Sequence, residues 1–455
     1  MHLFDEAMIH KYNRSGPRYT SYPTALEFAP IETGGEQKIL EGRQQDVPVS
    51  LYFHIPFCRH LCYYCGCNKI ITKKNADAGD YLEYLFAEIK HKRRLMKGNP
   101  VVKQLHLGGG TPTFFADEEI VALWNFLQDE FDFVLENEGD FSIEIDPREL
   151  GENTLKTLRT LGFNRVSFGV QDLEETVQIA VNRVQSESLI RSVMSESRQL
   201  GYHSINIDLI YGLPHQTVET LANTVERIID ISPDRLSVFN YAHLPERFPA
   251  QRKIKDEDLP SPADKLVMLG NTINTLTDSG YQYIGIDHFA KPDDELAVAQ
   301  QQGNLHRNFQ GYTILGDCDL LGFGVSSISQ IGNHILQNNT DLKAYKKAIE
   351  VKQLPAIKQI EATAEDELRC YIIMNLLCHD YMDFADIEAK FAINAQAHFA
   401  QQIEQLKDMQ ADELVAIDDK GIRILPKGRL LGRNVAMVFD EYLENKHKNR
   451  FSKVI

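Results

Sequence analysis

The chain concentrates four cysteines in one short stretch, CRHLCYYCGC, which contains Cys58, Cys62, Cys65 and Cys67. The full sequence has 455 residues and seven cysteines. An odd number of thiols, mostly gathered in one stretch, is untypical of the disulfide framework of a secreted protein. We therefore expect these thiols to be reduced and to take part in chemistry.

Cys58, Cys62 and Cys65 form the pattern CxxxCxxC directly after a strand-like run. A redox dithiol needs only CxxC, and a structural zinc site usually takes its four ligands from two separated pairs. Three thiolates on one tight loop suit a 4Fe-4S cluster, because each can bind one iron corner. The fourth iron then stays open to a substrate or cofactor. The pattern favours the cluster, with zinc and a dithiol as the alternatives.

The residues around the thiols predict alternating strands and helices. Helical spacing at 80–96 and 220–231 separates apolar, β-rich runs of strand length. This alternation predicts parallel strands wrapped by helices. Six such runs are recognisable: SLYFHIP from 50, QLHLGGG from 104, FSIEIDP from 141, NRVSFGVQD from 164, SINIDLIYGLP from 204 and DRLSVFNYAHLP from 234.

Polar residues at the carboxyl ends of these strands favour an incomplete (β/α)6 TIM-like barrel over a doubly wound open sheet. Barrel active sites form from the ends of many strands. Any one of these residues alone could instead be a helix cap or a loop residue. The polar residues at these positions are Glu144 and Asp146, Gln171 and Asp172, Asp208, and Asn240 to His243.

The sequence predicts three parts. An N-terminal segment spans 1–48, the barrel domain spans 49–355, and a small, mostly helical C-terminal domain spans 356–455. A hairpin turning at Asp419 to Gly421, followed by a last helix, makes this third part resemble a winged helix. It has no strong basic run, so we interpret it as a lid or packing element.

The formal net charge of −17 argues against attraction to nucleic acid or to anionic membrane. The N-terminal stretch lacks the basic start and apolar core of a signal peptide, and no run of about 18 uncharged apolar residues occurs. These features predict a soluble, cytoplasmic protein without membrane insertion. A monomer is the default expectation.

The CxxxCxxC spacing resembles the radical S-adenosylmethionine (SAM) superfamily, in which an aromatic residue precedes the last cysteine, here Tyr64. The resemblance implies one 4Fe-4S cluster on Cys58, Cys62 and Cys65, with exchangeable SAM on the open iron and a 5′-deoxyadenosyl radical as product. It also gives roles to GGGTP at 108–112 and to Glu144. Glycines let a backbone approach a ligand closely, and a carboxylate can bind the SAM amino group or ribose. The alternatives are a plain tight turn and a structural salt bridge.

Further stretches resemble the oxygen-independent coproporphyrinogen III oxidase (HemN) family along essentially the whole chain. They are YTSYPTALEF, YFHIPFCRHLCYYCGCNKI, LHLGGGTPT, EIDPREL, NIDLIYGLP, RLSVFNYAHLP, HRNFQGYT, LLGFGVSSIS, KGRLLGRN and FSKVI. The resemblance implies anaerobic oxidative decarboxylation of two propionates of coproporphyrinogen III to vinyl groups, giving protoporphyrinogen IX in haem biosynthesis. An electron donor for the cluster and an electron acceptor are implied partners, but the sequence identifies neither.

The family binds two SAM molecules, which the resemblance assigns to two residue sets. The first is Tyr52, Gly109, Glu144 and Ile328; the second is Tyr64, Gly110, Thr111, Gln171, Arg183, Asp208 and Ala242. A surface salt bridge is the alternative for Arg183. Cys67 has no iron left to bind, so we expect it to act in catalysis; simple packing is the alternative.

The substrate implied by the resemblance is an apolar macrocycle with four carboxylates, whose recognition needs placed cations and aromatics. We expect these from the N-terminal segment, which should close over the barrel mouth, and from HRNFQGYT. The candidates are Arg14, Arg18, His306, Arg307 and Tyr312. A haem-binding chaperone of the same superfamily is the main rival. Such relatives usually lack a cysteine at the position of Cys67.

Overall fold

The computed structural model describes residues 4–443, so FSKVI lies outside the described residues. Six parallel strands follow one another in chain order and pair as neighbours. They are β2 (Val49–Ile55), β5 (Val101–Gly109), β7 (Asp140–Ile145), β8 (Arg165–Gln171), β9 (Ser204–Tyr211) and β10 (Arg235–Asn240). Each lies where the sequence predicts a strand.

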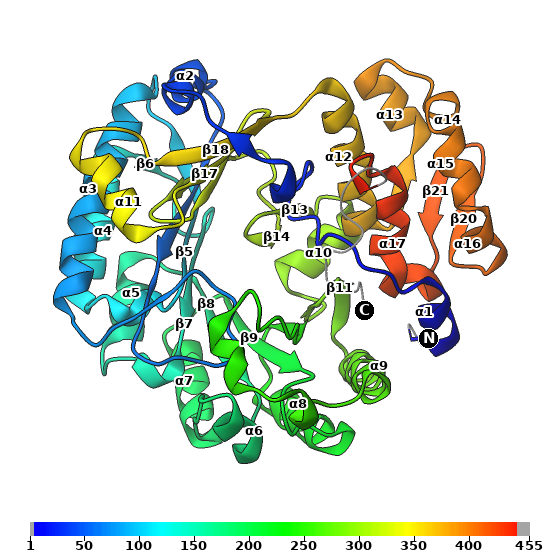
Figure 1. The fold of residues 1–455 in the computed structure, drawn as a ribbon, viewed down its shortest axis with the longest axis horizontal. Helices are drawn as coiled ribbons and strands as arrows, with labels where there is room; N and C mark the ends of the chain where they lie inside the picture. The colour runs from blue at the N-terminus through cyan, green and yellow to red at the C-terminus, as the bar shows by residue number, and fades with distance from the viewer. Residues whose placement is uncertain (1–3, 444–455) are drawn as a thin grey trace.

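Helices between these strands cover the outer face of the curved sheet (Figure 1). They are α3 (Ala76–Leu95), α4 (Asp117–Glu130), α5 (Thr154–Leu161), α6 (Glu175–Ala180), α7 (Glu187–Gln199) and α8 (Val218–Ile231). Their buried faces join the outward side chains of the strands in one core, which includes Ile143, Phe168 and Ile207. The incomplete (β/α)6 barrel is confirmed.

The sheet does not close on itself but continues with added strands at both edges. Beyond β10 lie β12 (His288–Ala290) and β11 (Gln282–Gly285). Beyond β2 lies β15 (Asp319–Phe323), which is parallel to it, followed by antiparallel β16 (Ile328–Ile331), β17 (His334–Asn338), β18 (Ala356–Glu361) and β1 (Ala29–Pro30). The large sheet therefore runs on to Glu361.

The inner face of the six strands is polar. Side chains alternate across a strand, so Phe141, Ile143 and Ile145 point to the helices while Ser142 and Glu144 point inward. These inward side chains line an open cavity of ≈ 210 Å³, which we call the lumen. A closed (β/α)8 barrel instead fills its interior with branched apolar residues. The open edge leaves room here for a ligand.

The C-terminal part has its own core, separate from that of the barrel. It contains α12 (Ala364–His379), α13 (Phe384–Phe391), α14 (Ala395–His398), α15 (Ala400–Gln405) and α16 (Lys407–Ala411). A small sheet of β19 (Tyr381–Asp383), β21 (Gly421–Ile424) and β20 (Val415–Ile417) completes it. The predicted hairpin is present, with the Asp418 carboxylate accepting from the backbone N–H groups of Lys420 and Gly421.

The expected last helix is present but short. The chain forms a 3-10 turn at Pro426–Leu431, the short α17 (Gly432–Ala436) and a second 3-10 turn at Met437–Phe439. Pro426 and two glycines disfavour a continuous helix. Gly428 also packs against the Leu414 backbone so closely that a side chain would not fit.

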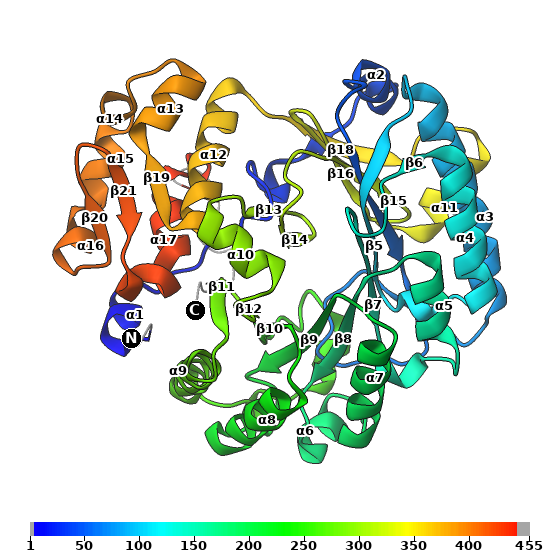
Figure 2. The ribbon, with the colours of Figure 1, turned by 180° about the vertical axis from the view of Figure 1, so that it is seen from behind.

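The N-terminal segment connects the two cores (Figures 1 and 2). Helix α1 (Glu6–Tyr12) lies on the C-terminal domain, where Asn434 Nδ2 donates to Tyr12 O at 2.7 Å. Tyr19 and Tyr22 are buried in that domain's core. The chain then crosses to α2 (Gly35–Gly42), which packs on the barrel helix α3. Within residues 4–443, none of the helices has the length and apolar character needed to cross a bilayer.

Candidate active site

The thiol loop, residues 58–67, follows β2 at the carboxyl end of the parallel strands. A short parallel pair fixes its base, with β3 (Phe57–Cys58) against β4 (Ile70–Ile71). Within the loop, the Cys65 N–H donates to Cys62 O at 3.3 Å, and Lys69 Nζ donates to Cys65 O at 2.8 Å. These bonds fold Cys58, Cys62 and Cys65 into one compact turn.

Hydrogen-bond donors point at two of the three sulfur atoms. Thr111 Oγ1 donates to Cys58 Sγ at 3.5 Å, and both Arg148 Nη2 and Arg183 Nη1 reach Cys62 Sγ at 3.6 Å. Donors and positive charge favour a thiolate over a thiol. The surroundings of Cys62 therefore suit a negatively charged sulfur.

Asp146 balances the two arginines beside Cys62. Its carboxylate accepts from Arg148 Nη2 at 2.7 Å and from Arg183 Nη1 at 2.9 Å. Burial alone would raise the pKa of Asp146, but Arg148 and Arg183 lower it below its usual value. Arg183 is thus part of a buried network rather than a surface salt bridge. The ion pairs hold both guanidinium groups against the thiol loop.

Cys65 and Cys67 differ in their titration. A hydrogen bond from Cys67 is the main cause that lowers the pKa of Cys65 to about 6. The same bond is the main cause that raises the pKa of Cys67 well above its usual value. Cys67 is exposed, whereas Cys62 is buried. Cys67 therefore stays a protonated, accessible thiol next to the other three.

The glycine turn after β5 approaches the thiol loop through its backbone. The Gly110 N–H donates to Ile55 O and the Thr111 N–H to Phe57 O, both at 2.8 Å. A Cβ on Gly110 would lie 2.8 Å from the Pro56 carbonyl carbon. Gly109 has φ +119°, which side chains rarely tolerate. Only glycine lets this turn pack against the base of the loop.

The expected first SAM set comes together at the ends of β2, β5 and β7. Glu144 Oε2 accepts from the Gly109 N–H at 3.1 Å, and Tyr52 stacks on His106 at 5.9 Å. Burial opposes ionisation of Glu144, but the His106 hydrogen bond and the Gly109 N–H lower its pKa. Ile328 adjoins Gly322, which pairs with Tyr52 in the sheet.

Most of the expected second set surrounds the thiol loop. The carbonyls of Tyr64 and Ala242 both accept from Gln251 Nε2, at 2.9 and 3.2 Å. Gln171 ends β8 with φ 71°, and Arg183 donates to the Gly169 carbonyl two residues before it. Gly110 and Thr111 belong to the glycine turn.

Asp208 is the remaining member of the second set and lies on β9, facing the lumen. Its carboxylate accepts from Asn206 Nδ2 at 2.8 Å and from Ser167 Oγ at 3.4 Å. Burial, and then the charge of Glu144, raise its pKa to about 6. Within the described residues, no cation makes an ion pair with Asp208.

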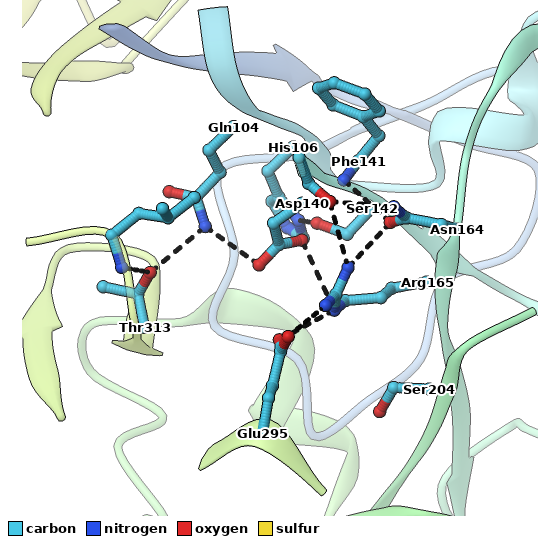
Figure 3. A network of polar contacts seen from close by, with 12 residues as sticks. Gln104, His106, Asp140, Phe141, Ser142, Asn164, Arg165, Ser204, Glu295 and Thr313 are labelled. Carbon is cyan, nitrogen blue, oxygen red and sulfur yellow. Dashed lines mark hydrogen bonds and ion pairs between the residues drawn. The ribbon is translucent and has the colours of Figure 1, made fainter. Parts of the chain in front are cut away.

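A charge-balanced network lines the lumen near the amino ends of the strands (Figure 3). Arg165 forms an ion pair with Glu295 and a weaker one with Asp140 at 3.8 Å. Gln104 Nε2 donates to Asp140 at 3.2 Å and to Thr313 Oγ1 at 3.4 Å. Through Glu295 and Thr313, these contacts hold the added segments to the barrel.

The five candidate substrate contacts separate in the structure. Arg18, Arg307 and Tyr312 lie together, with the Arg307 guanidinium 4.7 Å from the Tyr312 ring centroid. Arg14 instead donates to Asn434 O at 3.4 Å. His306 is exposed, and its ring lies over Gly316.

Three contacts of the site were not predicted from the sequence. His106 bonds Glu144, Arg148 reaches Cys62, and Gln251 holds the Tyr64 backbone. Position 106 faces inward from a strand and Arg148 directly follows the Asp146-Pro147 strand end, so both had a detectable signal. Gln251 lies in an irregular segment that showed none. The Asp172 carboxylate accepts from the Glu174 N–H at 2.7 Å and from Thr224 Oγ1 at 3.1 Å, so its contacts are structural.

The thiol loop fits an iron-sulfur cluster. Three cysteines share one turn, donors reach two of their sulfurs, and a side-chain-free backbone lies beside them. Within residues 4–443, no three His, Cys, Asp or Glu side chains converge as ligands of a single metal ion. A cubane takes its thiolates at separate iron corners, so it does not require such convergence.

Comparisons with known proteins agree with this site. The Radical SAM superfamily model matches residues 52–228, and the HemN C-terminal domain model matches residues 362–431. The chain is 51% identical to the oxygen-independent coproporphyrinogen III oxidase of Escherichia coli, covering 99% of this chain and 98% of the relative. It is 48% identical to that of Pseudomonas aeruginosa, covering 99% of each.

A solved structure shares the whole architecture. The crystallised coproporphyrinogen III oxidase (HemN) from Escherichia coli, described as a radical SAM enzyme, matches with a TM-score of 0.91 and 48% identity, over 96% of this chain and 99% of that one. The chain therefore belongs to the oxygen-independent coproporphyrinogen III oxidase family of radical SAM enzymes, oxidoreductases of haem biosynthesis.

Proposed function

We propose that this chain converts two propionate side chains of coproporphyrinogen III into vinyl groups without oxygen, releasing carbon dioxide and forming protoporphyrinogen IX. The observation that carries the proposal is the thiol loop beside the glycine turn, at the mouth of an open, polar lumen. The named relatives are coproporphyrinogen III oxidases along their whole length. An electron donor and an electron acceptor complete the reaction.

The proposed cluster ligands are Cys58, Cys62 and Cys65, which leave the fourth iron open for SAM. When bound, the cluster and SAM supply one-electron chemistry strong enough to break an unactivated C–H bond. The chain's own residues set the charge around the ligands. Arg148 and Arg183 stabilise the Cys62 thiolate, and Thr111 donates to Cys58.

We assign the first SAM molecule to Tyr52, Gly109, Glu144 and Ile328. The lowered pKa of Glu144 keeps its carboxylate charged, so it can accept from an amino group or a ribose hydroxyl. The second SAM molecule is assigned to Tyr64, Gly110, Thr111, Gln171, Arg183, Asp208 and Ala242. There the Asp208 carboxylate, whose burial raises its pKa to about 6, would gain a donor when the ligand arrives.

Cys67 is proposed to act on substrate or SAM rather than on iron, because it is an exposed, protonated thiol beside the loop. Cys67→Ser should keep wild-type iron and sulfide and lose nearly all carbon dioxide release. Cys370→Ser, a half-buried thiol in the C-terminal domain, is the control. Loss of iron in Cys67→Ser would return Cys67 to the ligand set.

The decisive assay uses anaerobically reconstituted protein with SAM, a reductant and carboxyl-labelled coproporphyrinogen III. Labelled carbon dioxide and 5′-deoxyadenosine are the expected products. Tight haem binding without carbon dioxide release would support a haem chaperone and contradict the proposal.

The proposed organisation is a monomeric, cytoplasmic enzyme with parts at 1–48, 49–355 and 356–455. In this proposal the N-terminal segment closes over the barrel mouth, and the Arg18–Asp287 ion pair and the Arg18–Phe239 contact support it. Deleting residues 1–25 would also remove Tyr19 and Tyr22 from the C-terminal core. The test is therefore Arg18→Gln in the full chain, and unchanged turnover and substrate affinity would contradict closure.

A further inference from the structure

Three guanidinium groups from distant parts of the chain come together beside the lumen. They belong to Arg18 in the N-terminal segment, Arg307 in β13 (His306–Asn308) and Arg433 in α17. Arg307 Nη2 donates to Arg18 O at 3.4 Å. Burial, then Arg433 and Arg307, lower the pKa of Arg18 to about 10. Burial is also the main cause that lowers the pKa of Arg433 to about 10, and Arg307 contributes.

The charges of Arg18 and Arg307 are not fully balanced within the part of the chain that the structure describes. Asp287 is the carboxylate that faces this arginine group, through an ion pair with Arg18. Arg307 is only 9% exposed, yet within the described residues its Nε and Nη1 atoms have no hydrogen-bond partner. Buried guanidinium donors are normally paired. Among the described residues, Arg307 therefore keeps unused hydrogen-bond donors and its positive charge beside a single ion-paired carboxylate.

Among the described residues, the other groups that face Arg18 and Arg307 do not supply negative charge. Tyr211, Tyr283 and Tyr312 are phenols, and burial raises the pKa of each. Burial, then Arg307 and Arg18, lower the pKa of His288 to about 3, which keeps it neutral. The Asp380 carboxylate, which lines the neighbouring cavity, is already paired with Arg429 at 2.7 Å.

Aromatic rings connect the arginine group to the lumen. Phe239, His288 and Tyr312 all line the lumen, with centroids 6.1 Å apart for Phe239 and His288 and 5.3 Å for His288 and Tyr312. The Arg18 guanidinium lies 5.9 Å from the Phe239 centroid, and its side chain remains 39% accessible. On another side, Asp287 and Arg433 line a small cavity of ≈ 40 Å³ between the barrel and the C-terminal domain.

We propose that Arg18, Arg307 and Arg433 form a carboxylate-binding subsite that holds propionate groups of the tetrapyrrole, with Phe239, His288 and Tyr312 against the macrocycle. The inference rests on the proposed function for the identity of the substrate. Guanidinium groups bind carboxylates through two parallel hydrogen bonds, and aromatic faces suit an apolar ring system. The bound carboxylates would satisfy the donors of Arg307.

In this subsite, the N-terminal segment and the C-terminal domain both contribute to substrate binding. Each contributes one arginine to a site whose third arginine comes from an added hairpin of the barrel, β13 with β14 (Gly311–Thr313). The barrel strands alone contain none of the three. Substrate carboxylates would therefore tie the three parts of the chain together when the macrocycle binds.

The test measures binding without turnover, using full-length reconstituted protein and two fluorescent probes, coproporphyrin III and its tetramethyl ester. The wild type should bind the tetra-acid at least about tenfold more tightly than the ester, as expected for charge-assisted hydrogen bonds. Arg307→Gln should lose most of that preference, and Arg307→Lys should regain part of it. Arg433→Gln is a second variant, expected to behave like Arg307→Gln.

SAM also has a carboxylate, so its affinity is measured in the same variants and should not change. Arg369→Gln is the matched control, because Arg369 is a buried arginine of the C-terminal domain that is paired with Glu365. Arg369→Gln should lower thermal stability and leave the preference for the tetra-acid over the tetramethyl ester unchanged.

Three results would overturn the subsite. They are an unchanged acid preference in both Arg307→Gln and Arg433→Gln, a fall in SAM affinity alone, or a loss of stability equal to that of Arg369→Gln with normal probe binding. Failure of the wild type to release carbon dioxide from coproporphyrinogen III would instead contradict the proposed function. Because probe binding does not depend on turnover, the two failures are distinguishable.

Discussion

The thiol loop and the arginine group differ in how far apart their residues lie along the chain. Cys58, Cys62 and Cys65 share one loop whose base is fixed by backbone hydrogen bonds. Arg18, Arg307 and Arg433 come from three separate parts of the chain. The loop is therefore assembled by local structure, whereas the arginine group exists only after the whole chain has folded.

The two regions also differ in charge balance. Beside the thiol loop, the Asp146 carboxylate pairs with both nearby guanidinium groups. Within residues 4–443, Arg18 is ion-paired with Asp287, and the buried Arg307 guanidinium has unused donors. A region whose buried charges are paired is stable before a ligand binds. A region with unpaired buried charges gains the most stability when a ligand of opposite charge binds. Variants in the two regions should therefore fail in different ways.

The largest expected effect is at the loop. Cys62→Ser removes the sulfur that Arg148 and Arg183 reach, so we expect iron content near background and no SAM cleavage, with or without substrate. Iron analysis and 5′-deoxyadenosine formation check this. Cys318→Ser alters a thiol outside the loop and should behave as wild type. A Cys62→Ser enzyme that keeps its iron would show that the loop does not act as one unit.

The next effect is on stability. Asp146→Asn leaves Arg148 and Arg183 without their shared carboxylate, and loss of one partner of a buried pair costs about 3–5 kcal/mol. Urea unfolding of the apo protein at pH 7 measures it. The pKa of Asp146 is lowered, so this stabilisation is present above its unfolded pKa and is lost in strong acid, where the variant and the wild type should converge.

Asp230→Asn provides the control for that measurement, because Asp230 pairs with Arg191 at an exposed position. Exposed pairs contribute little, so this variant should unfold like the wild type. If Asp146→Asn did the same, the charge balance beside the loop would not be structural, and the contrast with the arginine group would disappear.

Sequence reasoning succeeded where chemistry and structure are local. CxxxCxxC, the glycine turn and the strand ends gave the six core strands and the thiol loop, because each signal lies within one βα unit. The shortness of the last helix was not predicted, because the close packing of Gly428 on Leu414 is a tertiary contact. Arg433 was missed because nothing in KGRLLGRN indicates that it meets residues 18 and 307.

Substituting Asp208 tests whether a buried charge without an ion-pair partner indicates a ligand-binding position inside the lumen. This residue belongs to the proposed second SAM set, yet no cation pairs with it among the described residues, and burial and then Glu144 raise its pKa to about 6. The folded protein therefore holds a proton between about pH 4 and pH 6 that the unfolded chain has released. Stability falls as the pH rises through that window, and the cost is complete above it.

Asp208→Asn removes this cost, so the apo protein should become more stable at pH 7 by about 1–3 kcal/mol and unchanged near pH 3. The same variant should bind SAM more weakly, because the ligand loses a carboxylate acceptor. Asp129→Asn, an exposed change on α4, should alter neither quantity. Higher stability with weaker SAM binding would place Asp208 with the arginine group, as a charge kept unbalanced for a ligand. Unchanged stability would mean that its hydrogen bonds from Asn206 and Ser167 already satisfy it.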